Sequence, residues 1–132
     1  MLRYMLDTDI CIYLNKRHPS KLLERFNRLA GQIAVSTITL GELYFGAEKS
    51  DRRAENFMAL DGFFSGLEVL DFSRQAARHF ADLRAGLEKS GKLIGPYDLL
   101  IGAHARSEGL ILVTNNEREF RRIPGLAMEN WT

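Results

Sequence analysis

Three acidic residues of the sequence, Asp7, Glu42 and Asp98, stand where folded chains gather polar groups for catalysis. Asp7 ends the apolar run 4–6, Glu42 lies early in an apolar helical segment, and Asp98 follows a Gly-Pro pair. Glu119 comes shortly after a second apolar run. Carboxylates that share one space repel each other unless a cation neutralises them, and their hard oxygens suit Mg²⁺ or Mn²⁺. These residue types in these places favour a metal-dependent reaction.

Each acid also has a purely structural explanation. Asp7 can cap the helix that follows it, and Glu42 completes a capping box over residues 39–42. Asp98 lies in the first turn of a helix, where the helix dipole favours a negative charge. Glu119 lies in an exposed, charged stretch. For Glu119 alone the structural explanation is the stronger one. For Asp7, Glu42 and Asp98, only the joint placement after strands and at helix starts favours chemistry over capping.

Other common chemistries lack their residues in this chain. Cys11 is the only cysteine, which excludes an intramolecular disulfide and predicts a small buried side chain. The histidines His18, His79 and His104 lie far apart, without the paired spacing of a zinc site, and are expected on the surface or in helix packing. No phosphate-binding glycine loop and no serine-nucleophile motif occurs.

The elements that must position the acids alternate along the chain. Strands are expected at 3–6, 33–36, 67–70, 110–113 and 126–128. Helices are expected at 8–15, 21–30, 39–47, 53–65, 74–90, 97–107 and 117–121. Strands separated by helices predict a parallel sheet with helices on both faces, and ligands bind beyond the carboxyl ends of such strands. Asp7 and Asn115-Asn116 lie at two of these ends.

Length and composition limit the classes of protein to which this chain can belong. The 132 residues are enough for one domain, and 45% hydrophobic with 27% charged residues is typical of a globular protein. A net charge of +1 requires any polyanion to meet a local basic patch, for which 52–53 and 118–122 are candidates. No run is long enough for a membrane span, and the acids at 7 and 9 interrupt any signal peptide, so a cytoplasmic protein is expected.

Three stretches resemble the toxin members of the PIN-domain nucleases. They read MLDTDICIYL near the start, STITLGELYFGAEKS in the middle and GPYDLLIGAHARSEGLILVTNNEREFRRIPGLAMENW at the end. The likeness covers essentially the whole chain and is closest to the VapC toxins of enteric bacteria. It implies a single PIN domain over residues 1–132, a three-layer α/β/α fold with a parallel sheet in strand order 3-2-1-4-5.

The resemblance also implies roles for individual residues. Asp7 and Asp98 match the principal metal-binding acids, Glu42 matches the third acid, and Glu119 is the acid of the VapC-like pattern at the fourth position. Many PIN domains carry an aspartate where this chain has Asn116, so either Asn116 or Glu119 fills that place. The residues expected to hold the acids in place by hydrogen bonds are Thr8, Thr114 and Asn116.

The implied activity is a Mg²⁺-dependent endoribonuclease, with Mn²⁺ as a substitute ion. The implied substrate is RNA, with the anticodon loop of initiator tRNA as the target in enteric relatives, so that translation stops. The implied partner is a VapB-type antitoxin that silences the toxin and carries the contacts to operator DNA. Relatives form homodimers and larger heterooligomers with antitoxin, and no membrane is involved.

Two other readings of the sequence remain open. Asp7-Thr8-Asp9 after an apolar strand also begins the haloacid-dehalogenase pattern of phosphotransferases, but no acid directly follows the run 110–113 as that family requires. A non-catalytic interaction module, with the acids as helix caps and the apolar helices as a groove for a partner, is the second. Metal-dependent RNA cleavage distinguishes the nuclease from both.

Overall fold

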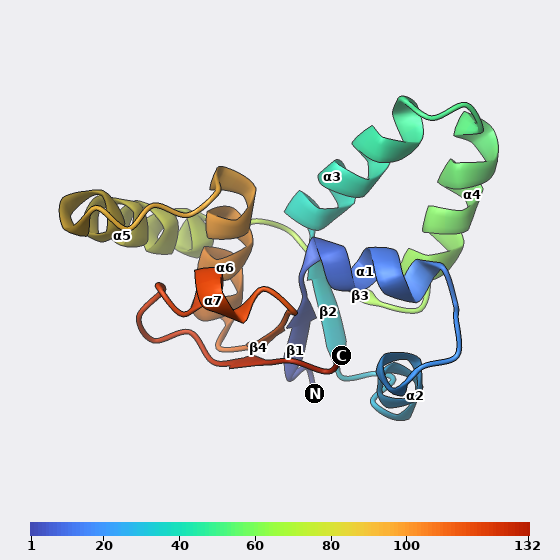
Figure 1. Cartoon of the computed structure of the whole chain (residues 1–132), viewed down its shortest axis with the longest axis horizontal. Coiled ribbons are helices and arrows are strands. Elements are labelled where there is room, and N and C mark those ends of the chain that lie inside the picture. Colours follow the sequence, from blue (N-terminus) through green and yellow to red (C-terminus); the bar gives the residue numbers. More distant parts are fainter.

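The computed structural model describes all 132 residues and forms one parallel sheet between two groups of helices (Figure 1). The strands are β1 (Tyr4–Leu6), β2 (Ile33–Ser36), β3 (Glu68–Leu70), β4 (Ile111–Val113) and β5 (Met128–Glu129). The helices are α1 (Thr8–Asn15), α2 (Lys21–Arg28), α3 (Thr37–Glu48), α4 (Arg53–Phe64), α5 (Arg74–Ser90), α6 (Pro96–Glu108) and α7 (Glu117–Phe120). The sheet order β3-β2-β1-β4-β5 confirms the order that the resemblance implies.

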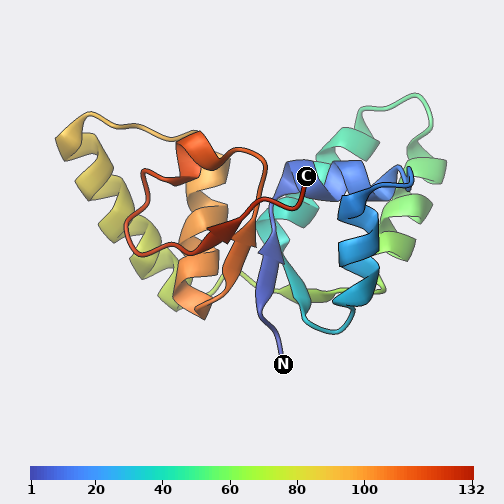
Figure 2. The same cartoon turned by 60° about the horizontal axis from the view of Figure 1, so that its bottom comes forward.

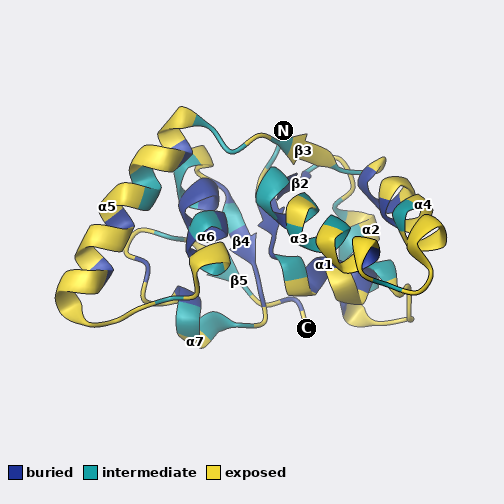
Figure 3. Ribbon diagram, turned by 90° about the horizontal axis from the view of Figure 1, so that it is seen from above, coloured by how far each residue is buried: buried dark blue, intermediate teal, exposed yellow.

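The two faces of the sheet carry separate apolar cores, because neighbouring residues of a strand point to opposite sides. Tyr4 and Leu6 of β1 pack with α1 to α4, whereas Met5 packs with α5, α6 and α7. In β4, Val113 joins the first core and Leu112 the second. Figure 3 shows the central strands β1, β2 and β4 mostly buried, the edge strand β3 exposed, and the outer sides of the helices exposed. The predicted three-layer α/β/α fold is confirmed.

Helix ends agree with the capping residues of the sequence. The Ser73 hydroxyl accepts a hydrogen bond from the Ala76 amide at 3.1 Å, which fixes the start of α5. Gly91 and Gly109 end α5 and α6 in the left-handed conformation, with φ of 72° and 67°. These glycines take a backbone shape that costs other residues free energy.

One expected boundary is wrong, and it changes the interpretation of Glu42. The helix expected from residue 39 begins at Thr37, because Ser36 caps it and its hydroxyl accepts from the Ile38 amide at 3.1 Å. Thr39 therefore lies inside α3 and is fully buried. The capping-box explanation for Glu42 fails, since the helix starts before the box.

The register of the central strands brings distant residues together. β1 pairs in parallel with β4, with Leu6 opposite Val113, and the Asp7 amide donates to the Val113 carbonyl at 3.0 Å. Asp7 and Thr114 are therefore neighbours just beyond the carboxyl ends of these strands. Figure 2 shows this end of the sheet beside α1 and α7, with the N-terminus at the opposite end.

The structure also shows the surroundings of Cys11 and the length and apolar character of the helices. Cys11 on α1 is completely buried in the first core, as its apolar surroundings predict. None of the helices combines the length and the apolar character that crossing a membrane requires.

Candidate active site

Asp7 is both a helix cap and the buried acid at the end of β1. Its side chain is 3% exposed. One oxygen accepts from the Ile10 amide at 2.9 Å, and the other accepts from the Thr114 hydroxyl at 2.5 Å. Burial, with smaller contributions from the charges of Asp9 and Glu42, raises the pKa of this carboxyl to about 6 against the effect of both hydrogen bonds.

Glu42 is turned from α3 toward the start of α1. The Thr8 hydroxyl donates to the Glu42 carboxylate at 2.6 Å, and it also lies 3.2 Å from the hydroxyl of Thr39. Thr8 follows Asp7 directly, so this hydrogen bond places the third acid beside the first. Glu42 itself is half-buried, with its carboxylate partly open to solvent.

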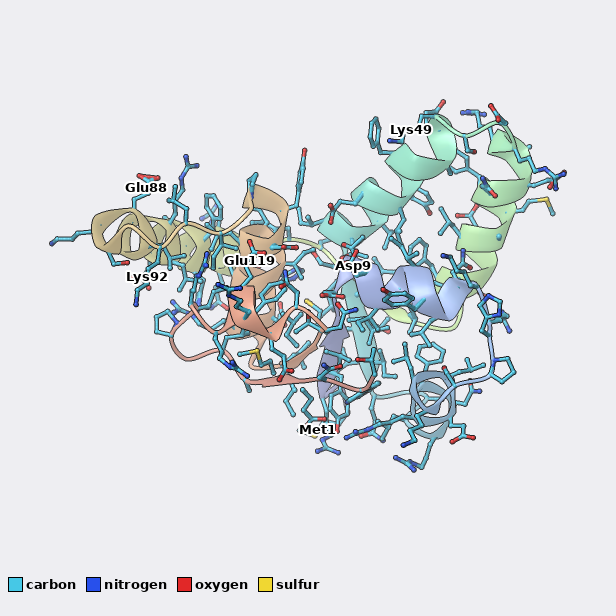
Figure 4. The ribbon with its side chains drawn as sticks, in the orientation of Figure 1. Met1, Asp9, Lys49, Glu88, Lys92 and Glu119 are labelled. Atoms are coloured by element: carbon cyan, nitrogen blue, oxygen red, sulfur yellow. The ribbon has the colours of Figure 1, made fainter.

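Asp98 enters the same space from the first turn of α6. Burial first, and then the negative charges of Glu119, Asp7, Glu42 and Asp9 in that order, raise the pKa of its carboxyl to about 6. Charge interactions weaken with distance, so these carboxylates lie around one space. Figure 4 labels Asp9 and Glu119 at this end of the sheet and Met1 at the opposite end.

Glu119 uses both of its carboxylate oxygens within the protein. One accepts from the Gly95 amide at 2.7 Å, and the other accepts from the Asn116 side-chain amide at 2.9 Å. The Gly95 amide, followed by Asn116 and the charge of Arg122, holds the pKa of Glu119 below its usual range despite partial burial. Because Gly95 is the N-cap of α6, Glu119 fixes the start of the helix that carries Asp98.

A chain of hydrogen bonds connects Asp7, at the end of β1, with Glu119 on α7. The Asn116 amide donates to the Thr114 hydroxyl oxygen at 2.9 Å, and Thr114 in turn donates to Asp7. Asn116 also holds Glu119, so Asp7 and Glu119 belong to one network. The structure thus gathers every residue predicted for the site at one end of the sheet: Asp7, Thr8, Glu42, Asp98, Thr114, Asn116 and Glu119.

The acids form an open cluster rather than a closed ligand shell. No three acidic, histidine or cysteine side chains lie close enough together to enclose a metal ion. The donor set nevertheless fits a hard divalent cation, because Mg²⁺ keeps several waters and needs only one or two carboxylates. Asp7 and Asp98 are the two acids of the site whose pKa is raised, in both mainly by burial and in part by neighbouring negative charges.

Two contributors to the site were not predicted from the sequence. The Gly95 amide holds Glu119, and buried Thr39 lies against Thr8. The Gly-Pro pair before Asp98 marks a helix start, where backbone amides lack partners within the helix. This pattern could have pointed to the contact of the Gly95 amide. Thr39 could not be recognised, because its place depends on the true start of α3.

Comparison with known proteins identifies the class. The family model of the PIN domain matches residues 4–126, which is nearly the whole chain. The protein therefore belongs to the PIN-domain family, whose nucleases depend on divalent metal ions.

The relatives define the group within that family. Ribonuclease VapC2 of Haemophilus influenzae is 54% identical over 131 residues, covering 99% of each chain. The tRNA(fMet)-specific endonuclease VapC of Shigella flexneri is 48% identical over 132 residues, covering 100% of both. The crystal structure of DNA-bound VapBC from Salmonella typhimurium contains a chain with TM-score 0.96, 49% identity and full coverage of both chains. Within the PIN-domain family, the protein belongs to the VapC ribonucleases.

Proposed function

We propose that this protein is the toxin of a type II toxin–antitoxin pair and acts as a Mg²⁺-dependent endoribonuclease. The observation that carries the proposal is the convergence of four carboxylates at the ends of β1 and β4, where burial and mutual repulsion raise the pKa of Asp98 to about 6. A divalent cation relieves that repulsion, and a nuclease of this family requires one. Mn²⁺ is expected to substitute for Mg²⁺.

We propose separate roles for the acids. Asp7 and Asp98 would hold the ion, and Glu42 would orient the attacking water from the position in which Thr8 holds it. Glu119 acts as a catalytic-site acid that fixes the start of α6 through Gly95. Thr8, Thr114 and Asn116 support these acids by the hydrogen bonds described above.

The bound ion would polarise the phosphodiester and lower the pKa of a water. Asp7 is rigid because a cap bond and a strand-end hydroxyl fix its two oxygens, which keeps the metal-binding carboxylates in register. Hydrolysis adds the water oxygen to phosphorus and breaks the bond to the 3′ oxygen. The products are a 3′-hydroxyl and a 5′-phosphate.

We propose initiator tRNA as the substrate, cut in its anticodon loop so that translation stops. The support is the name of the Shigella flexneri relative, a tRNA(fMet)-specific endonuclease, at 48% identity over the full chain. An unpaired loop suits an open cluster, since its bases can leave the stack. This substrate places the toxin in the cytoplasm.

We propose a VapB-type antitoxin as the partner, with a toxin homodimer inside a larger heterooligomer. The support is the DNA-bound VapBC structure from Salmonella typhimurium, to one chain of which this protein is 49% identical. Contacts with operator DNA belong to the antitoxin. We further propose that residues 1–132 act as one PIN domain, because both apolar cores share the same sheet.

The test is cleavage of purified initiator tRNA and of an elongator tRNA by the free protein, with Asp98→Asn as the matched variant. We expect a single cut in the anticodon loop of initiator tRNA, loss of cutting in chelator, and loss of at least about a hundredfold in the variant. Full cutting by Asp98→Asn would overturn the assignment of the site.

A further inference from the structure

One segment beside the candidate active site concentrates the positive charge of the protein. Residues 16–28 contain five basic residues and one acidic residue, a charge of +4 in a chain whose net charge is +1. The remaining residues contain 13 basic and 16 acidic side chains, a charge of −3. The five basic residues of the segment are Lys16, Arg17, Lys21, Arg25 and Arg28.

The two basic patches that the sequence marks are partly neutralised by neighbouring glutamates. Arg52 and Arg53, which the sequence marks as a candidate patch, form ion pairs of 3.3 and 2.7 Å with glutamates. Arg121 of the second candidate patch lies 3.9 Å from a glutamate carboxylate. Within 16–28, Arg25 alone forms an ion pair, with Glu129 at 3.0 Å. Four of the five basic residues of this segment therefore carry charge that no acid of the protein pairs with.

Two of these residues, Lys16 and Lys21, line a hollow between α1 and α2. Its volume is about 470 Å³, and it is open to solvent. Tyr13 presents half of its side-chain surface to solvent at the edge. The lining residues are Tyr13, Lys16, His18, Ser20, Lys21, Leu22, Asn115 and Thr132.

The hollow adjoins the acidic cluster through two elements. Asn115 of its lining follows Thr114, which donates to Asp7. Tyr13 stands four residues after Asp9 on α1, so the two share one face of the helix and lie about 6 Å apart along its axis. A strand passing over the acids can continue into the hollow.

We propose that this hollow binds the RNA nucleotides that flank the cut phosphodiester, an inference that rests on the proposed function. The acids repel the RNA backbone, so the binding free energy has to come from neighbouring nucleotides. Lys16 and Lys21 neutralise phosphates, and the ring of Tyr13 stacks against an unpaired base.

The features favour RNA over an acidic protein segment. A half-exposed aromatic ring among unpaired lysines is the combination with which proteins bind single-stranded nucleic acid. An acidic peptide would gain from the lysines but has no base to place on Tyr13.

The experiment measures binding of a fluorescent RNA hairpin carrying an initiator anticodon loop, in chelator so that cutting does not interfere. The Lys16→Gln/Lys21→Gln protein is compared with wild type and with the Lys89→Gln/Lys92→Gln control, whose lysines lie at the far end of α5 (Figure 4). We expect the plot of log Kd against log salt to lose about one unit of slope per patch lysine, and the control to match wild type.

A second pair of variants tests the stacking. Tyr13→Phe keeps the ring and is expected to bind like wild type, whereas Tyr13→Ala is expected to raise Kd at least about fivefold. Melting temperatures equal to wild type confirm that the variants fold.

Equal Kd and equal salt slope for the patch and control variants would overturn the proposal, whether or not wild type cuts tRNA. A patch variant that loses affinity for antitoxin but keeps its affinity for the hairpin would overturn it too. Failure of wild type to cut tRNA contradicts the proposed function instead, and the binding result still decides the role of the hollow.

Discussion

Among single residues, Asp7 carries two functions that the sequence presents as alternatives. One oxygen caps α1 through the Ile10 amide, and the other meets Thr114 at the end of β4. Capping and chemistry are compatible because a carboxylate has enough lone pairs for both. The cap makes the acid rigid, and its burial raises the pKa to about 6.

The raised pKa of Asp98 predicts a pH-dependent stability. The folded protein keeps the proton of Asp98 up to about pH 6, whereas the unfolded chain releases it near 4. The contribution of this group to stability is therefore complete below pH 4 and falls as the pH rises through 6. We expect the advantage of Asp98→Asn in free energy of unfolding to grow over this range in metal-free buffer.

Urea unfolding of both proteins from pH 4 to pH 7 measures this difference. Burial lowers the pKa of His104, which works in the opposite direction, but it affects both proteins equally and cancels in the difference. An advantage that stays constant across the range would show that Asp98 titrates normally.

Glu119 allows its charge to be separated from its hydrogen bonds. Glu119→Gln keeps an oxygen for the Gly95 amide, and the amide of Asn116 can turn to meet the new donor. We expect this variant to lose less than about tenfold in cleavage, whereas Glu119→Ala loses the anchor of α6 and about 1 kcal/mol of stability. The measurements are magnesium affinity, cleavage rate and melting temperature of both variants. If Glu119→Gln is as inactive as Glu119→Ala, the negative charge of Glu119 is itself required for cleavage.

At the level of helices and strands, most of the fold could be predicted from the sequence. Apolar runs and capping residues locate β1, β2 and α5 within one residue, because these signals are local. The convergence of the acids could be expected once the sheet is parallel. The start of α3 was missed because both Ser36 and Thr39 are residue types that cap helices, and the folded chain uses Ser36.

The details of the site depend on tertiary contacts and could not be read locally. No sequence pattern indicates that Glu119 accepts a hydrogen bond from the Gly95 amide, which is 24 residues away in the chain. The basic hollow was missed for a similar reason. Its charges are dense in sequence, but their lack of partners shows only in the folded chain.

Two glycines test the account of the helices. Gly109 ends α6 with φ of 67°, so Gly109→Ala is expected to cost about 1 kcal/mol. Gly86 lies exposed within α5 with open space around it, so Gly86→Ala is expected to stabilise the protein by up to about 1 kcal/mol. Thermal unfolding distinguishes them, and equal shifts of the same sign would contradict the assignment of Gly109 as the cap.

Across the whole molecule, charge is sorted into two neighbouring regions. Acids that follow β1 or lie on α3, α6 and α7 meet at one end of the sheet, and the basic segment 16–28, which follows α1 and includes α2, lies next to them. The first region requires a cation, and the second attracts a polyanion. A ribonuclease requires both, and their adjacency follows from the order of strands and helices.

Four melting curves test whether the acids form one cluster that a cation neutralises. Wild type and Asp98→Asn are melted in chelator and then in excess Mg²⁺. Removing one like charge is worth about 1 kcal/mol, so the variant should melt about 3 °C higher without metal. Mg²⁺ should raise the melting temperature of wild type and that of the variant much less. Equal melting in chelator together with equal responses to Mg²⁺ would contradict a shared metal site.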